Sequence, residues 1–264
     1  MYRSLLYVPA HSDRFLSKAH ERGADAIILD LEDAVPEADK DRARAGLTAS
    51  VAQVGRNGAA VFVRINAGAR AVDDARAAKA AGAAGVVVAK ADLAGLAALA
   101  PVEIPLLALI ESPAGVLDAR ACAAATNVIA LMVGGEDLAT ALGGEATPEV
   151  LRVPKLLVHY AARAEGKLSF GLLRSVSDYS DLDGIRAAAE EAHAHGFDGA
   201  TCVHPSAVPI LNLGFAPSAE EINWARRVVD GARVSDGAFS LDGQMIDKPV
   251  VERARRILAQ ASRH

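Results

Sequence analysis

The chain has little of what marks several classes of protein. Its 264 residues include only two cysteines, Cys122 and Cys202, which are far apart and form no CxxC pair. A disulfide framework or a zinc site is therefore not expected, and a reducing cytosol fits. The net charge of −5 argues against a nucleic-acid surface. With no apolar run near the ~20 residues of a membrane span and no signal-peptide pattern, we expect a cytoplasmic protein without membrane or nucleic-acid partners.

Familiar catalytic motifs are also missing: neither a Ser-His-Asp arrangement nor a phosphate-cradling GxxxxGK[ST] loop is visible. What the chain does have is a regular alternation of short apolar, β-rich runs with helix-forming stretches. The eight runs are Ser4–Val8, Ala26–Asp30, Ala60–Ile65, Gly85–Ala89, Leu106–Ile110, Ile129–Val133, Leu168–Leu173 and Gly199–Val203. Short apolar runs without alternation are typical of buried parallel strands. Eight such units predict an α/β protein with a (β/α)₈ TIM barrel, and an open doubly wound sheet is the alternative.

We expect the barrel domain to cover residues 1–232, its eighth unit being closed by a helix that opens at Pro217. Residues 233–264 then form a C-terminal extension. The segment Phe239–Ile246 is typical of a hairpin around Asp242-Gly243, and a final helix follows it. A barrel does not require this piece, so we expect it to act as a lid or to cross to a neighbouring subunit.

Polar residues follow almost every predicted strand, at the end where barrel enzymes have their active sites. Charges in such places are costly unless they are paired or bound to a metal. The set consists of His11, Asp30, Glu32, Asp33, Arg64, Asn66, Lys90, Glu111, Glu136, Asp137 and His204. We infer a ligand site at this face, with Gly134 and Gly135 letting the backbone approach the ligand closely.

Two of these strand ends suit a hard cation such as Mg²⁺. Glu111 ends one strand, and Glu136-Asp137 follows the next. The alternative is that these acids simply begin the following helices. Sequence spacing does not decide whether Glu136 or Asp137 points toward the ligand.

A second acidic group, Asp30, Glu32 and Asp33, lies near Arg64 in the predicted fold. Alternation places Arg64 on the same face as Phe62, inside the barrel, where its charge needs a substrate anion or a structural carboxylate. Glu32 and Asp33 either hold metal-bound waters in the second shell, as Asp30 could, or pair with Arg64 and Lys90.

Taken in order, several motifs resemble the citrate lyase β-subunit-like (CitE-like) proteins of the HpcH/HpaI aldolase and malyl-CoA lyase superfamily. They are Arg3-Ser4-Leu5-Leu6-Tyr7-Val8-Pro9, Leu29-Asp30-Leu31-Glu32-Asp33-Ala34-Val35, Val63-Arg64-Ile65-Asn66, Leu109-Ile110-Glu111-Ser112, Gly135-Glu136-Asp137-Leu138, His204-Pro205-Ser206 and Asp242-Gly243-Gln244-Met245-Ile246-Asp247-Lys248-Pro249. The resemblance covers essentially the whole chain. One departure is Ser112-Pro113, where relatives usually have Thr-Ala.

The resemblance implies a barrel assembled as a homotrimer or hexamer. It assigns Mg²⁺ to Glu111 and Asp137, contact with the substrate oxyanion or carboxylate to Arg64, and the acid/base role to Asp247, reaching the site from a neighbouring subunit. Arg14, Lys18 and Arg174 are candidate contacts for coenzyme A, although they also fit ordinary surface bases.

The resemblance further implies an enzyme that cleaves or forms a 3-hydroxyacyl-CoA thioester, such as citryl-, citramalyl- or malyl-CoA. The products of cleavage would be acetyl-CoA (or a homologue) and a 2-oxo acid such as oxaloacetate or pyruvate. The alternatives are an aldolase acting on free hydroxy-oxo acids, a malyl-CoA thioesterase and a non-catalytic subunit that binds an oxo acid.

Overall fold

The computed structural model describes residues 2–174, 179–235 and 237–262. The first residue of the expected barrel domain and the last two of the expected extension therefore lie outside the described residues. The chain divides into two compact units, Tyr2–Gly214 and Phe215–His264. Among the described helices, none is long and apolar enough to cross a membrane.

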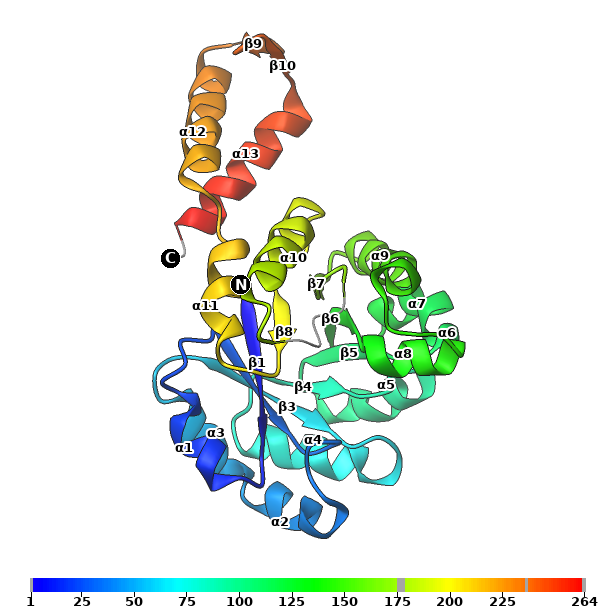
Figure 1. The fold of residues 1–264 in the computed structure, drawn as a ribbon. Coiled ribbons are helices and arrows are strands. Elements are labelled where there is room, and N and C mark those ends of the chain that lie inside the picture. The colour runs from blue at the N-terminus through cyan, green and yellow to red at the C-terminus, as the bar shows by residue number, and fades with distance from the viewer. Residues whose placement is uncertain (1, 175–178, 236, 263–264) are drawn as a thin grey trace. The chain divides into compact units, whose positions relative to one another are not determined.

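The larger unit is built on eight strands, all parallel to their neighbours, in the order β7-β6-β5-β4-β3-β2-β1-β8 (Figure 1). They are β1 (Ser4–Pro9), β2 (Ala26–Asp30), β3 (Ala60–Ile65), β4 (Gly85–Val88), β5 (Leu106–Ile110), β6 (Val128–Val133), β7 (Leu168–Phe170) and β8 (Ala200–Cys202). A parallel bridge between Phe170 and Gly199 joins β7 to the start of β8. The predicted TIM barrel is therefore confirmed.

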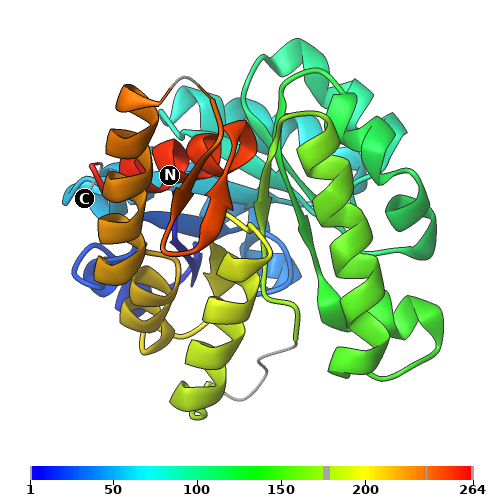
Figure 2. The same ribbon diagram turned by 90° about the horizontal axis from the view of Figure 1, so that it is seen from above.

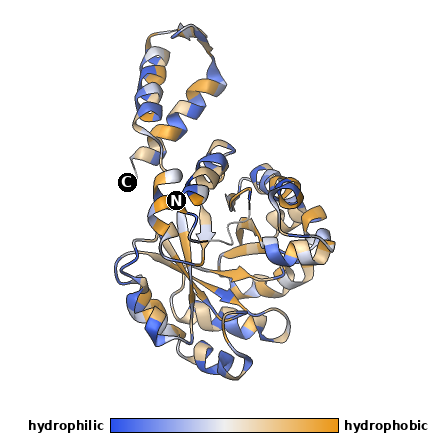
Figure 3. Cartoon of the chain, viewed as in Figure 1, coloured by the Kyte–Doolittle hydropathy of each residue, from blue (hydrophilic) through white to orange (hydrophobic). Residues whose placement is uncertain are grey.

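The strands are apolar because both of their faces are buried. In Figure 3 they are largely hydrophobic in colour, whereas the helices are mixed. Inward-facing side chains such as Leu5, Phe62 and Leu107 fill the barrel interior. Glycine is required at position 85, because a Cβ there would lie 2.7 Å from the Pro105 carbonyl oxygen and 3.0 Å from the Phe62 ring. Outward-facing residues pack against the helices.

Helices follow the strands in the order that the alternation predicts. Those of the larger unit are α1 (Asp13–Ala19), α2 (Lys40–Ala45), α3 (Leu47–Gly55), α4 (Ala71–Ala80), α5 (Leu93–Leu99), α6 (Pro113–Leu117), α7 (Ala119–Ala124), α8 (Gly135–Leu142), α9 (Pro148–Ala164), α10 (Leu182–Ala194) and α11 (Ala207–Gly214), with short 3₁₀ turns at Glu37–Asp39, Gly68–Arg70 and Ala100–Val102. Side-chain caps at Asp92, Ser112, Thr147 and Asp181 begin four of them.

The helix that completes the eighth unit is α11, not the one that opens at Pro217. Helix α11 directly follows β8 and contacts β1 and β8. The next helix, α12 (Ala219–Val234), packs instead on α13 (Lys248–Ala261) in the smaller unit. Pro209 within the short apolar stretch of α11 obscured its helical pattern. The compact units therefore divide at Gly214, whereas the sequence had suggested residue 232.

The smaller unit consists of α12, a hairpin of β9 (Phe239–Leu241) and β10 (Gln244–Ile246), and α13, seen from above in Figure 2. The predicted hairpin is confirmed, and Asp242 and Gly243 both have positive φ (53° and 78°), as its tight turn requires. The unit has a small core that includes Ala225, Val228 and Ile246.

Candidate functional site

A cavity of about 710 Å³ opens at the carboxyl ends of the barrel strands. Most of the site residues expected in the barrel line it. They are Asp30, Asp33, Arg64, Glu111, Gly134, Gly135 and Asp137. Glu32 does not line the cavity and forms ion pairs with Arg64 and Lys90. The fold thus gathers at one cavity the residues that the sequence had placed at separate strand ends.

Glu111 directly follows β5, and its side chain is buried. Its Oε2 accepts a hydrogen bond from the backbone N–H of Lys90, 2.6 Å away. Lys90 reaches this position with a φ of 51°, an uncommon conformation for a residue other than glycine. The end of β4 is therefore shaped to hold the Glu111 carboxylate in place.

Asp137 lies in the first turn of α8, which begins immediately after β6. Burial, together with the adjacent Asp137 carboxylate within hydrogen-bonding reach, raises the pKa of Glu111 from its ordinary 4.5 to about 7, although the hydrogen bond from the Lys90 N–H opposes this rise. Two carboxylates this close repel each other unless a proton or a cation lies between them. Glu136 shares the first turn of α8 and also lines the cavity.

The donor set fits a magnesium ion. Mg²⁺ is commonly held by one or two carboxylates, with waters or substrate oxygens completing six ligands. Among the described residues, no group of three or more His, Cys, Asp or Glu side chains could hold a metal. The chemistry of the Glu111–Asp137 pair therefore fits a cation that keeps several waters better than one held in a closed all-protein site.

Gly134 packs directly against Glu111. A Cβ on Gly134 would lie 2.5 Å from Glu111 Oε1 and 2.6 Å from its Cγ. The φ of Gly134 is −82°, so space, not backbone conformation, demands glycine here. A Cβ on Gly135 would lie 3.0 Å from Leu151 Cδ1. Both glycines therefore allow side chains of the protein to approach closely at the start of α8. Their predicted contact with a ligand stays a prediction.

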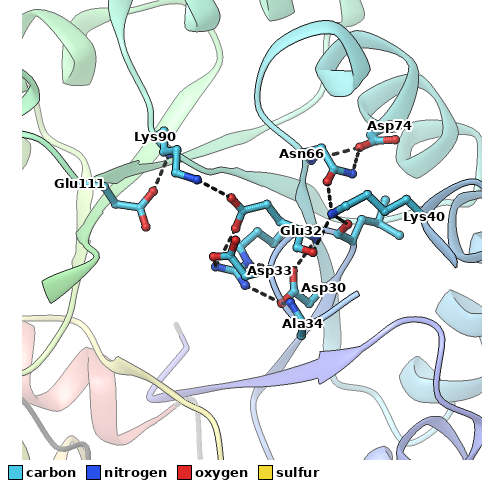
Figure 4. Close-up of polar contacts among 11 residues, drawn as sticks. Asp30, Glu32, Asp33, Ala34, Lys40, Asn66, Asp74, Lys90 and Glu111 are labelled. Carbon is cyan, nitrogen blue, oxygen red and sulfur yellow. Dashed lines mark hydrogen bonds and ion pairs between the residues drawn. The ribbon is translucent and has the colours of Figure 1, made fainter. Parts of the chain in front are cut away.

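The acidic cluster on β2 is arranged differently (Figure 4). Asp30 stands opposite Arg64 in the register of β2 and β3, and it accepts two hydrogen bonds from Arg64, from Nε at 2.8 Å and Nη2 at 2.5 Å. Arg64 Nη1 also lies 3.1 Å from Glu32 and 3.5 Å from Asp33. The guanidinium group is therefore surrounded by three carboxylates.

Lys90 completes this network, because its Nζ lies 3.1 Å from Glu32 Oε1. The second oxygen of Glu32 faces Arg64 without hydrogen-bond alignment. Burial raises the pKa of Glu32, and its contact with Asp33 adds to this, while Arg64 and Lys90 lower it. Of the two expectations for Glu32 and Asp33, pairing with Arg64 and Lys90 is the one present in this structure.

Arg64 is itself largely buried and lies over the ring of Tyr7, 5.2 Å from its centroid. Burial opposes its charge, but the hydrogen bonds to Asp30 outweigh this and raise its pKa. The structural ion pair that the sequence left open is thus present. Contact between Arg64 and a substrate stays a prediction.

Sequence reasoning missed three residues in or near the cavity. Lys40 Nζ donates to the carbonyl oxygens of Leu31 (3.0 Å) and Glu32 (2.7 Å) and to Asn66 Oδ1 (2.6 Å), which fastens the loop after β2. It looked like an ordinary surface base near a helix start. Tyr7 and Lys155 line the cavity. Tyr7 could have been found from strand alternation, whereas no local pattern marked Lys155.

Asp247 belongs to the smaller unit. It is the N-cap of α13, and its side chain accepts a hydrogen bond from the Val250 N–H at 3.4 Å. This capping bond gives the carboxylate a structural role. Its predicted acid/base role is a separate hypothesis, taken up below.

Comparison with known proteins places the chain in a family. Residues 3–205 match the HpcH/HpaI aldolase/citrate lyase family model. A citrate lyase subunit beta-like protein of Mycobacterium tuberculosis H37Rv is 38% identical over 266 residues, covering 97% of this chain and 94% of the relative. A (3S)-malyl-CoA thioesterase of Cereibacter sphaeroides is 35% identical, covering 98% of this chain and 94% of the relative.

Solved structures agree. CitE of M. tuberculosis in complex with magnesium, acetoacetate and coenzyme A superposes with a TM-score of 0.84 at 34% identity, covering 98% of this chain and 97% of the other. The M. tuberculosis citrate lyase beta subunit with oxaloacetate and magnesium gives 0.72 at 32% identity, covering 81% and 97%. The family model matches residues 3–205, and relatives match this chain along nearly its whole length. The chain, with its eight parallel strands and the carboxylates gathered at their ends, therefore belongs to the HpcH/HpaI aldolase/citrate lyase family of enzymes.

Proposed function

We propose that the protein is a Mg²⁺-dependent carbon–carbon lyase that cleaves or forms a 3-hydroxyacyl-CoA thioester, such as citryl-, citramalyl- or malyl-CoA. The products of cleavage are acetyl-CoA (or a homologue) and a 2-oxo acid. The observation that carries the proposal is the pair of carboxylates, Glu111 and Asp137, held together at the cavity with no basic side chain hydrogen-bonded to either among the described residues. Relatives with magnesium, coenzyme A and oxo acids support it.

Glu111 and Asp137 would hold the ion. When bound, Mg²⁺ supplies Lewis acidity toward the oxygens of the oxo-acid part, where charge accumulates during bond cleavage. The Lys90 N–H fixes one oxygen of Glu111, which leaves the other directed toward Asp137 and Gly134.

The other residues have roles that follow from their positions and from the resemblance. Arg64 stabilises negative charge on the substrate, and its carboxylate neighbours Asp30, Glu32 and Asp33 keep it protonated and oriented. Gly134 and Gly135 let the substrate approach the backbone at the start of α8. Asp247 exchanges the proton at the thioester α-carbon. We expect a homo-oligomer, a trimer or hexamer, which native mass spectrometry would reveal. The free thiols of Cys122 and Cys202 support a cytoplasmic location.

The test is a panel of the three thioesters, assayed for Mg²⁺-dependent release of acetyl-CoA together with a 2-oxo acid. The Asp137→Ala variant should lose this activity. Full activity in that variant, or undiminished activity of the wild type in a chelator, would refute the proposal. Running the same panel with the free hydroxy acids distinguishes a thioester lyase from an aldolase, and magnesium-dependent oxo-acid binding without any turnover would favour a binding subunit.

A second candidate is hydrolysis of malyl-CoA, in which water attacks the thioester carbonyl to give malate and free coenzyme A. The specific support is the similarity to proteins named (3S)-malyl-CoA thioesterase over 98% of this chain. Free thiol released without an oxo acid would identify this reaction, whereas stoichiometric glyoxylate and acetyl-CoA would identify the lyase.

A further inference from the structure

The cavity is lined by three cationic side chains among the described residues, Arg64, Lys155 and Arg174. Two of them already have an ion pair. Arg64 contacts three carboxylates, and Arg174 Nη2 lies 3.4 Å from Glu191 Oε2. Lys155 has neither a hydrogen bond nor an ion pair within the described part of the chain. It is therefore the cavity cation that has no direct contact with a carboxylate in the described part of the chain.

Lys155 lies on α9, with only 8% of its surface exposed. Burial lowers its pKa to about 8, and electrostatic attraction by Glu136 partly offsets this effect. At neutral pH, Lys155 is consequently still protonated in most molecules. A buried ammonium group without a partner is destabilising, and an anion placed beside it removes that penalty. Such an arrangement is typical of a binding position rather than of a structural lysine.

The position of Lys155 relative to the metal pair follows from two adjacent glycines. A Cβ on Gly135 would lie 3.7 Å from Lys155 Nζ, whereas a Cβ on Gly134 would touch Glu111. The ammonium group and the Glu111 carboxylate thus flank the dipeptide from which α8 begins. The N–H groups of Gly135 and Asp137 donate no hydrogen bond among the described residues. Free N–H groups and the helix dipole favour an anion here as well.

We propose that Lys155 is a specificity-determining residue that binds a second carboxylate of the substrate and so selects a dicarboxylic 2-oxo acid over a monocarboxylic one. This inference rests on the proposed function, in which an ion held by Glu111 and Asp137 binds the oxygens of the oxo-acid part; we assign to it the carboxylate next to the oxo group. Lys155 then meets the carboxylate at the other end of the molecule. Its burial within the barrel cavity favours a small carboxylate over the phosphates of a nucleotide.

The test compares binding of oxaloacetate and pyruvate by calorimetry in the presence of Mg²⁺. Lys155→Met removes the charge but keeps a side chain of similar length. It should weaken the binding of freshly prepared oxaloacetate by at least about tenfold, the effect of losing a hydrogen bond to a charged group. Pyruvate binding should change by less than about threefold. Arg174→Met is the matched control, because Arg174 lines the same cavity but is already paired, and it should spare the preference.

Folding is checked by the thermal midpoint without ligand, which should not fall in Lys155→Met, since a buried unpaired charge is removed. If that variant misfolds, Lys155→Gln replaces it. Equal binding of oxaloacetate by wild type and variant, or an equal loss of both acids, would overturn the inference even if lyase activity is present. A wild type that turns over no thioester, yet prefers oxaloacetate through Lys155, would instead refute the lyase and support the inference.

Discussion

Two acidic clusters border the same cavity, and they are built in opposite ways. On the β2 side, Asp30, Glu32 and Asp33 surround Arg64, and Lys90 adds a further base. On the β5–β6 side, Glu111 and Asp137 face each other, and the donor to Glu111 is a backbone N–H. The first cluster balances its charge within the protein. The second is left with excess negative charge.

The difference teaches which carboxylates are available to a cation. Where a guanidinium group is already bonded to the acids, a metal ion would have to displace it. Where two carboxylates repel each other in a buried place, an incoming divalent cation relieves that repulsion. The same residue types at neighbouring strand ends therefore support a structural ion-pair network in one place and a metal site in the other.

The largest expected effect comes from removing Arg64 from the cluster on the β2 side. Arg64→Met should lower the free energy of unfolding by about 3–5 kcal/mol, because it leaves the buried Asp30 without its partner. Urea denaturation measures this change. Lys90→Met is the control, since its side chain is about half exposed, and should cost no more than about 1 kcal/mol. If Arg64→Met lowers the free energy of unfolding by less than about 1 kcal/mol, Asp30 must find another partner.

The next effect removes a ligand from the other cluster. Asp137→Asn should weaken Mg²⁺ binding by at least about 100-fold, because even residues behind the ligands commonly contribute 10–100-fold. Calorimetric titration with Mg²⁺ provides the measurement. Asp33→Asn is the control, because it makes the same carboxylate-to-amide change beside Arg64, away from the metal pair, and should leave Mg²⁺ affinity nearly unchanged. Equal losses in the two variants would contradict the division of roles.

Gly134→Ala tests how closely the backbone must approach Glu111. The new methyl group overlaps the Glu111 carboxylate and should destabilise the site by about 1–3 kcal/mol. Mg²⁺ affinity should therefore fall by roughly tenfold or more. Gly144→Ala is the control, because its Cβ would meet nothing nearer than 3.8 Å. Unchanged affinity in Gly134→Ala would show that Glu111 moves aside without consequence.

The last prediction concerns the pH dependence that Glu111 contributes, which is spread over several pH units. Folding raises its pKa from 4.5 to about 7, so the native state binds more protons than the unfolded chain between these values. This contribution to stability is present below pH 4.5 and is lost as the pH rises through 7. Unfolding in a chelator, compared between wild type and Glu111→Gln, isolates it.

Magnesium binding should show the opposite trend, with affinity falling about tenfold from pH 8 to pH 6, since the ion needs the carboxylate. A wild-type profile of stability parallel to that of Glu111→Gln would mean that the Glu111 carboxyl group keeps an ordinary pKa.

Local patterns predicted much of the fold. All eight strands were found, because each is an apolar run buried on both faces. The hairpin at Asp242-Gly243 was found because its turn requires residues that tolerate positive φ. The end of the barrel at Gly214 was not found, since it depends on which of two successive helices, α11 or α12, packs on the strands.

For the site, the sequence by itself determined which residues stand at the strand ends, because alternation and strand length settle where a side chain leaves the barrel. Tertiary structure decided what each one meets. The register of β2 and β3 sets Asp30 beside Arg64, and the packing of α8 brings Asp137 to Glu111. The fold of α9 over the cavity buries Lys155. Contacts of this kind join residues distant in sequence, so no local pattern encodes them.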